Sequence, residues 1–249
     1  MHEPITSSAG APELVSVVVP TRREVENIPS LLRRLDAAMR QAGRPYEAIL
    51  VDDDSRDGTD LAVERLAAEG IPARLVVRVG ERGLSSAALR GFHQARGDIL
   101  VCMDADLSHP PEAIPLLLEA IGKGADFVLG SRYVAGASRE ARWGFLRWLN
   151  SKAAALLARP LTPVKDPMSG FFALRRSVFE RAAPLRPIGY KIALELLVKC
   201  RRPQVREVPI HFASRLRGKT KLNLYQQWLY LRHLVRLAGY RLGAGSGDG

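Results

Sequence analysis

Residues 99–106 read Ile-Leu-Val-Cys-Met-Asp-Ala-Asp, an apolar run that ends in two carboxylates with one alanine between them. A short run that is apolar on both faces is typical of a strand buried in a parallel sheet. Alternate side chains of an extended segment point the same way, so we expect Asp104 and Asp106 to emerge together at the carboxyl end of this strand. Ligands of open α/β sheets bind at that edge. The stretch therefore predicts the fold class and the position of the binding site.

Similar apolar runs precede and follow this stretch, at residues 14–19, 48–51, 74–79 and 127–129. Segments whose apolar residues recur at i, i+3 and i+4 lie between them, at residues 28–42, 59–69, 84–95 and 113–121. This alternation predicts βαβ units and an α/β fold with a mainly parallel central sheet flanked by helices. Asp57 is expected to cap the second helix, and two prolines, Pro110 and Pro111, to open the fourth.

The regular alternation of strand-like and helical segments ends at Gly130. We expect a loop at 131–142, a helix through residue 158, a short apolar segment at 171–174, a helix at 192–200, a strand-like run at 205–212 and a last helix at 222–242. The domain prediction is a flexible N-terminal tail at 1–13, one α/β domain at 14–221, and a C-terminal amphipathic helix with a disordered tail at 222–249.

Composition limits the class of protein. The chain has 249 residues, 47% of them hydrophobic and 25% charged, which suits one globular domain and argues against disorder. Its two cysteines, Cys102 and Cys200, form neither a disulfide framework nor a zinc cluster, which favours a reducing compartment. No apolar run reaches the ~18 residues that span a bilayer, and the first residues do not have the layout of a signal peptide. We therefore expect a cytoplasmic protein.

Charge is divided unevenly along the chain. Residues 1–130 hold 14 Lys and Arg against 20 Asp and Glu, whereas residues 131–249 hold 23 against 6. A basic half of this kind suggests a phosphorylated substrate, an anionic lipid or a nucleic acid, with a solubilising surface as the alternative. Aromatic residues are only 6% of the chain and no nucleic-acid motif is present, so we expect no nucleic-acid partner.

Two acidic clusters carry the chemistry. The paired carboxylates Asp104 and Asp106 are hard oxygen ligands that suit Mg²⁺ or Mn²⁺, and such an ion would bridge the oxygens of a diphosphate. The second cluster, residues 52–57, follows another apolar run in the same way. Asp53 is expected to bind a nucleobase or ribose there, while Asp54 and Asp57 are assigned to the turn and to the helix cap.

Seven sequence motifs in a fixed order carry a resemblance. The sequence resembles the inverting glycosyltransferases of family 2, and within them the polyprenyl-phosphate (dolichol-phosphate) mannosyltransferases. The matching motifs are Val-Val-Val-Pro-Thr (17–21), Val-Asp-Asp-Asp-Ser-x-Asp-Gly-Thr (51–59), Arg-Gly-Leu-Ser-Ser-Ala (82–87), Met-Asp-Ala-Asp-Leu-Ser-His-Pro-Pro-Glu (103–112), Gly-Ser-Arg-Tyr (130–133), Asp-Pro-Met-Ser-Gly-Phe-Phe-Ala (166–173) and Gly-Tyr-Lys-Ile (189–192). The resemblance implies a GT-A nucleotide-sugar fold with a basic C-terminal acceptor region.

The resemblance also implies a GDP-mannose donor and its binding residues. The implied donor-binding positions are Pro20, Arg22, Glu24, Val51, Asp53, Asp104, Ala105, Asp106, Arg215 and Lys221. The implied metal ligands are Asp104, Asp106 and Ser108, the last at a position where some relatives have a glutamine. Arg22 and Arg23 stand where the family usually has Tyr and Asn, which leaves a UDP-sugar donor open.

On the acceptor side, the resemblance places the phosphate of a polyprenyl phosphate against Arg132, Arg147 and Ser151. Arg147 and Ser151 are four residues apart, so on a helix they share one face. A lipid phosphate is already an anionic nucleophile and needs no strong general base. We therefore expect in-line attack with inversion, and the catalytic residues of this hypothesis are Asp104, Asp106, Arg132 and Lys221. The alternative within the family is a hydroxyl acceptor.

Three further features have two interpretations each. His109 is expected to orient its loop rather than to bind metal. Glu195, an acid among apolar neighbours, either lines the acceptor region or forms a structural ion pair. The last helix interleaves leucines with arginines, which fits either an anionic membrane surface or packing on its own domain. A lipid acceptor then predicts a peripheral enzyme on the cytoplasmic face of a membrane, alone or docked on a membrane-protein partner.

Overall fold

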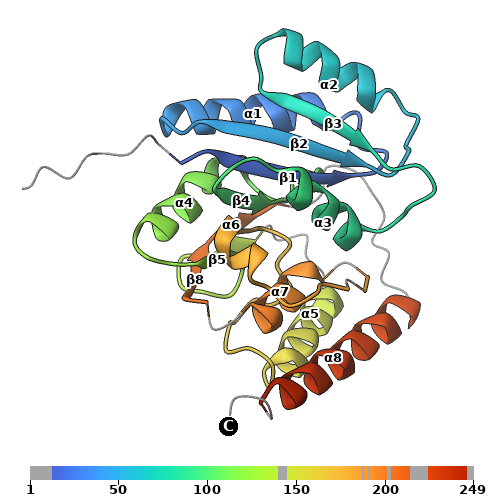
Figure 1. Cartoon of the computed structure of the whole chain (residues 1–249), viewed down its shortest axis with the longest axis vertical. Helices are drawn as coiled ribbons and strands as arrows, with labels where there is room; N and C mark the ends of the chain where they lie inside the picture. Colours follow the sequence, from blue (N-terminus) through green and yellow to red (C-terminus); the bar gives the residue numbers. More distant parts are fainter. Residues whose placement is uncertain are drawn as a thin grey trace, which may run out of the picture.

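Seven strands form one sheet in the order β3-β2-β1-β4-β7-β5-β8 (Figure 1). The computed structural model describes residues 13–139, 145–186, 188–189, 191–200, 203–213 and 224–245, and within them no side chains for 139, 145–151, 224–226 and 244–245. The strands of this sheet are β1 (Val15–Thr21), β2 (Tyr46–Asp52), β3 (Ala73–Val77), β4 (Ile99–Cys102), β5 (Phe127–Ser131), β7 (Phe172–Arg175) and β8 (Val205–Pro209). A second, two-stranded sheet pairs β6 (Ser138–Arg139) with β9 (His211–Phe212).

The strand register sets the position of the site. All pairs in the large sheet are parallel except those of β7, which runs antiparallel to both β4 and β5. β1 lies between β2 and β4, with Thr21 opposite Asp52 and Val18 opposite Cys102. Since parallel strands end at the same edge, the acidic residues that follow β2 and β4 meet beside the end of β1.

Helices cover both faces of the sheet because its strands are apolar on both faces. On one face lie α1 (Ile28–Gln41), α2 (Thr59–Ala68) and α4 (Ile114–Gly122), which pack with the odd-numbered valines of β1. On the other lie α3 (Leu84–Gln94), α6 (Arg176–Glu180) and α7 (Ile192–Lys199), which pack with Val18 and its neighbours. This layered arrangement confirms the predicted α/β class with its mostly parallel sheet.

Two longer helices, α5 (Phe145–Ala158) and α8 (Leu224–Gly245), lie side by side beyond α7, away from β1–β3 (Figure 1). Leu234 and Leu237 of α8 are buried in a small core with Ala158 of α5 and Leu194 of α7. The Tyr230 hydroxyl donates to the Ala154 carbonyl at 2.6 Å. Other apolar side chains of α8 are exposed: Trp228, Leu231, Val235 and Leu242. One stripe of the helix thus packs on the protein, as one of the two interpretations has it, and another faces outward; its contact with a membrane surface stays a prediction.

Most predicted elements are confirmed, and the differences have local causes. The strands and helices expected in residues 14–129 all form, and η1, a 3-10 turn at Pro111–Ala113, opens α4 as the prolines suggested. The Asp57 carboxylate accepts the Thr59 backbone N–H at 3.1 Å, as expected for the start of α2. The run at 205–212 is wrong as one strand: β8 ends at Pro209, which has no N–H to donate, and β9 pairs with β6 instead.

Glu195 of α7 forms a structural ion pair, which was one of its two interpretations. It is fully buried, and its Oε1 atom lies 2.7 Å from Lys199 Nζ and 3.2 Å from Arg236 Nη2 of α8. The Arg186 backbone N–H donates to the same oxygen at 2.8 Å, and His233 Nε2 lies 3.6 Å from Oε2. Burial by itself raises the pKa of Glu195, but these contacts outweigh it and lower the pKa to about 2.

The Glu195 cluster predicts how stability depends on pH. A carboxyl whose pKa is lower in the folded than in the unfolded protein stabilises above its unfolded pKa and loses that contribution as the pH falls. We expect Glu195→Gln to cost on the order of 2–3 kcal/mol at pH 7, and the difference from the parent protein to shrink between about pH 5 and pH 2. Thermal unfolding followed by circular dichroism across this range measures it. Glu180→Gln, which alters an exposed pair with Arg176, is the control; parallel curves for parent and Glu195→Gln would contradict the prediction.

Candidate functional site

The loop that follows β4 holds the paired carboxylates in place through His109. The His109 ring is buried, stacks on Phe171 with 5.3 Å between ring centroids and meets the edge of Phe212 at 5.6 Å. Burial lowers its pKa, which favours the neutral imidazole, and Nδ1 accepts the Asp104 backbone N–H at 3.0 Å. The predicted orienting role of His109 is confirmed.

A tight turn shapes the next part of the loop. The Asp106 Oδ1 atom accepts the backbone N–H of Ser108 at 3.0 Å and its hydroxyl at 2.5 Å. Ser108 is fully buried, so its hydroxyl is directed to Asp106. The Ser108 hydroxyl therefore orients the Asp106 carboxylate, and direct metal binding by Ser108 stays a prediction.

Backbone strain collects at this edge of the sheet. Four described residues other than glycine have positive φ angles: Arg23 (59°), Asp54 (51°), Arg56 (50°) and Leu107 (60°). They lie in the loops that follow β1, β2 and β4. Such conformations cost roughly 1–3 kcal/mol each and concentrate at functional sites. The strained loops therefore mark the same edge as the acidic residues.

Asp53, which follows β2, is bound within the protein by Arg78 and Gly83. Arg78 Nε donates to Asp53 Oδ1 at 2.8 Å, and the Gly83 backbone N–H donates to Oδ2 at 2.8 Å. Arg78 is fully buried and also donates to the Gly83 carbonyl at 3.0 Å. The pair joins the ends of β2 and β3 to the start of α3, so Asp53 positions this corner of the site. Arg78 is a single arginine directly after a strand, and nothing in the sequence around it marks it as part of the site.

The other positions assigned to the donor have different surroundings. Val51 is buried on the α3 face, and Ala105 is buried between the two carboxylates. Pro20 is buried, Arg22 is exposed, and Glu24 accepts the Asn27 side-chain amide at 2.6 Å. A cavity of about 480 Å³ opens beside the ends of β1 and β2, lined by residues 23–27 and 55–57. Arg215 and Lys221 lie outside the described residues.

Arg132, at the end of β5, forms a buried ion pair with Asp166. Its Nε and Nη2 atoms donate to the two carboxylate oxygens at 2.8 and 2.7 Å, and its backbone N–H donates at 3.0 Å. Asp166 is fully buried, and Glu207 accepts its backbone N–H at 3.0 Å. Although burial lowers the pKa of Arg132, the bonds to Asp166 raise it overall, so the group stays charged. Asp166 was missed as a site residue, although the motif that contains it was noticed.

Arg132 lies near the loop that carries the paired carboxylates. The Phe212 ring lies 5.6 Å from the His109 ring and 5.3 Å from the Arg132 guanidinium carbon, so it connects the two groups. The charge of Asp104 also contributes to the raised pKa of Arg132. The predicted acceptor residues Arg147 and Ser151 belong to α5 and are four residues apart in it. Their side chains are not among those that the structure describes.

Gly170 leaves room for the Asp104 carboxylate. A Cβ atom at position 170 would lie 3.3 Å from the His109 ring and 3.4 Å from Asp104 Oδ1. We expect Gly170→Val to displace the carboxylate and to lower turnover at least tenfold, with Gly170→Ala in between, because the larger branches reach further into the same space. Steady-state kinetics of both variants measure this. The control is Gly122→Val, at the end of α4, where an added Cβ meets no other atom within 4 Å. Equal losses of turnover in the two valine variants would contradict a local effect at Asp104.

The carboxylate oxygens of this site suit a divalent cation whose remaining ligands come from the substrate and water. Among the described residues, no group of three or more His, Cys, Asp or Glu side chains is placed to hold a metal ion. Asp104 and Asp106 offer two carboxylates from one loop. Mg²⁺ and Mn²⁺ are commonly bound by one or two carboxylates together with substrate phosphates and water, so the residues present fit such an ion.

Comparison with known proteins agrees with the fold. The family model described as "Glycosyl transferase family 2" matches residues 16–182, which is more than half of the chain. The chain therefore belongs to glycosyl transferase family 2.

Curated relatives narrow the comparison. A dolichol-phosphate mannosyltransferase of Pyrococcus furiosus is 48% identical over 227 residues, which cover 90% of this chain and 63% of the relative. A dolichol-phosphate mannosyltransferase of Saccharomyces cerevisiae is 44% identical over 237 residues, covering 92% of this chain and 88% of the relative. This chain thus spans less than two thirds of the archaeal relative and most of the yeast one.

A solved structure supports the GT-A fold. Glucosyl-3-phosphoglycerate synthase from Mycobacterium tuberculosis, in complex with Mn²⁺, UDP and glucosyl-3-phosphoglycerate, has a TM-score of 0.67 and 24% identity, covering 98% of this chain and 86% of that one. At this identity the likeness shows the fold alone. In the described part of this chain, no helix combines the length and the apolar character needed to cross a membrane.

Proposed function

We propose that this chain transfers mannose from GDP-mannose to a polyprenyl phosphate with inversion at the anomeric carbon. The observation that carries the proposal is the shared name of relatives that match about nine tenths of this chain at 44–48% identity, dolichol-phosphate mannosyltransferase. The site is consistent with it, because one sheet edge brings together a carboxylate pair and a buried arginine.

Donor binding is assigned to the ends of β1, β2 and β4. The nucleoside lies against Pro20, Arg22, Glu24 and Val51, at a corner that Asp53 and Arg78 keep rigid. Asp104 and Asp106 hold a divalent cation, Mg²⁺ or Mn²⁺, which supplies charge neutralisation for the donor diphosphate. His109 and Ser108 keep the two carboxylates oriented before substrate arrives, and such preorganisation lowers the cost of reaching the transition state.

Acceptor binding is assigned to Arg132 with Arg147 and Ser151 of α5. The bidentate bond to Asp166 fixes the plane of the Arg132 guanidinium, and an arginine has five N–H donors, so an oriented guanidinium can still donate to a phosphate. The acceptor phosphate is an anion at neutral pH, so this site needs to position it rather than to remove a proton. Arg215 and Lys221 are assigned to the departing nucleotide as cations.

A lipid acceptor implies a membrane surface as a partner. We place the enzyme on the cytoplasmic face of the membrane, alone or with a membrane-protein partner. The exposed apolar side chains Trp228, Leu231 and Val235 of α8, with Arg232 beside Trp228, support contact with a lipid interface.

The test is a transfer assay with purified protein, Mg²⁺ or Mn²⁺, labelled nucleotide sugars and a short polyprenyl phosphate, read by organic extraction. We expect label from GDP-mannose to enter the organic phase only when both the acceptor and a divalent cation are present. Transfer to a sugar hydroxyl in place of the lipid phosphate would contradict the proposed acceptor.

A second candidate donor is a UDP-sugar such as UDP-glucose. The arginines at positions 22 and 23, where the family usually has Tyr and Asn, leave this donor open. The same assay separates the two donors. If the UDP-sugar is the donor, its label will reach the lipid and label from GDP-mannose will not.

A further inference from the structure

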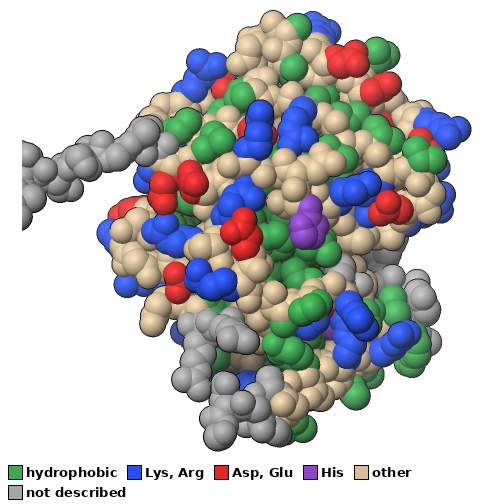
Figure 2. Space-filling view, viewed as in Figure 1, with side chains coloured by type: hydrophobic (Ala, Val, Ile, Leu, Met, Phe, Trp, Pro, Cys, Tyr) green, Lys and Arg blue, Asp and Glu red, His purple; other side chains and the backbone are tan. Residues whose placement is uncertain are grey.

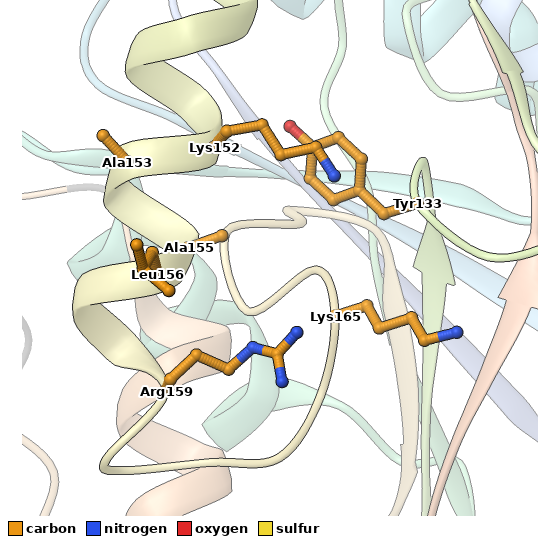
Figure 3. Close-up of a pocket in the computed structure, with 7 residues that line it drawn as sticks. All are labelled: Tyr133, Lys152, Ala153, Ala155, Leu156, Arg159 and Lys165. Atoms are coloured by element: carbon orange, nitrogen blue, oxygen red, sulfur yellow. The ribbon is translucent and has the colours of Figure 1, made fainter.

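A cavity of about 430 Å³ lies between α5 and the loops that carry Tyr133 and Lys165. Figure 3 shows Lys152 and Arg159 extending from α5 toward the loops opposite, where the Tyr133 ring faces Lys152; Lys165 starts on the facing side, and its side chain runs away from α5. Its volume is within the range of small-molecule sites. The cavity adjoins the acceptor side of the proposed active site, because Tyr133 follows Arg132 and Lys165 precedes Asp166, but it is lined by a different set of residues.

The lining combines positive charge with an apolar wall. Among the described lining residues, Lys152, Arg159 and Lys165 are cations and none is an acid. The Lys152 ammonium lies 4.0 Å from the centroid of the Tyr133 ring, a cation–π contact that holds it at the cavity. Arg159 extends from α5 toward the loop of Lys165 (Figure 3). The remaining wall is Ala153, Ala155 and Leu156.

The mouth of the cavity lies on an apolar surface of the same helix. Leu156 and Leu157 are 70% and 52% exposed, which is unusual for two adjacent leucines of a helix. On neighbouring α8, exposed Val235 and Trp228 stand among arginines, and Figure 2 shows this mixture of hydrophobic and basic side chains on the lower part of the molecule. A ligand that is anionic at one end and apolar at the other matches both the cavity and its mouth.

We propose that this cavity binds the phosphate headgroup of an anionic membrane phospholipid, with the acyl chains leaving over Leu156 and Leu157. The cavity lining does not include Arg132, whose guanidinium carbon lies 5.5 Å from the centroid of the Tyr133 ring, so the bound lipid would anchor the enzyme beside its acceptor. A bilayer phospholipid is favoured over the acceptor as occupant because the proposed function already assigns the acceptor phosphate to Arg132. The choice of occupant therefore rests on the proposed function, whereas the measurement of lipid binding does not depend on catalysis.

The experiment measures binding of short-chain phosphatidic acid below its micellar concentration, by calorimetry, with neither donor nor acceptor present. Three variants separate shape from charge. Ala155→Phe, at the lining alanine whose Cβ points toward the facing loops in Figure 3, fills the cavity without changing charge. Lys152→Gln with Arg159→Gln removes two lining cations, and Arg90→Gln with Arg206→Gln removes two exposed cations elsewhere. We expect the first two to weaken binding at least tenfold and the third to change it less than twofold.

Several results would overturn the proposal. Undiminished binding in Ala155→Phe together with an equal loss in both double variants would indicate attraction to surface charge. Inorganic phosphate binding as tightly as the lipid would indicate a free-phosphate site. Displacement of phosphatidic acid by a short polyprenyl phosphate in direct competition would assign the cavity to the acceptor. If Ala155→Phe does not fold, the comparison of the two double variants decides. Lipid binding in a protein without transferase activity would support this site and remove the proposed function.

Discussion

Replacing Asp106 by Asn is expected to lower the rate of sugar transfer by about a thousandfold without unfolding the protein. The variant exchanges a charged oxygen ligand for a neutral one, and the charge stabilisation that a metal site provides is worth several kcal/mol, or about three powers of ten in rate. Asparagine keeps an oxygen that can accept the Ser108 backbone N–H and hydroxyl, so the turn is preserved. Transfer rates at saturating donor and acceptor measure the effect, with circular dichroism to confirm the fold.

Two further measurements make the Asp106 prediction specific. Asp60→Asn, an exposed acid in the first turn of α2, should leave the rate unchanged. Ser108→Ala should lose roughly tenfold to a hundredfold, as expected for a group that orients a ligand. Binding of Mn²⁺ in the presence of GDP, read by electron paramagnetic resonance, should weaken in Asp106→Asn. Full transfer activity in that variant would exclude the carboxylate from the reaction.

The sequence predicted correctly the features that depend on residues close together in the chain. The apolar run 99–102 predicted β4 because every side chain of a strand that is buried on both faces is apolar. The positions of Asp104 and Asp106 directly after this run then placed both in the loop that follows it. The loop role of His109 and the bond from Thr59 N–H to Asp57, the residue before the N-cap Gly58, also followed from local chemistry. These features depend on neighbours within a few residues, which a sequence records directly.

Contacts between distant segments were not predictable in the same way. Arg78 meets Asp53 across 25 positions and Arg132 meets Asp166 across 34, and a charged residue in a sequence does not name its partner. The sequence therefore assigned Asp53 and Arg132 to substrate alone, whereas the structure gives each a buried partner. The ambiguity of Glu195 had the same origin, because Arg236 and His233 reach it from a helix about forty residues later.

Removing the partner of Arg132 is expected to have the second large effect. Asp166→Ala leaves a guanidinium that is 10% exposed without its bidentate carboxylate, and breaking a buried pair costs about 3–5 kcal/mol. We expect the melting temperature to fall by about 10 °C. Glu112→Ala removes a bidentate partner of Arg34 with similar distances but at the surface, where such a pair is worth about 1 kcal/mol or less.

The double variant Arg132→Met with Asp166→Leu separates the structural from the functional use of the pair. Replacing a buried ion pair by apolar residues of similar volume is often neutral or stabilising, so we expect the melting temperature to recover. Transfer activity should not recover, because methionine cannot donate hydrogen bonds to the acceptor phosphate. Activity close to that of the parent enzyme in the double variant would mean that Arg132 serves only the fold, and the acceptor phosphate would then have to be held by other cations of the basic half of the chain.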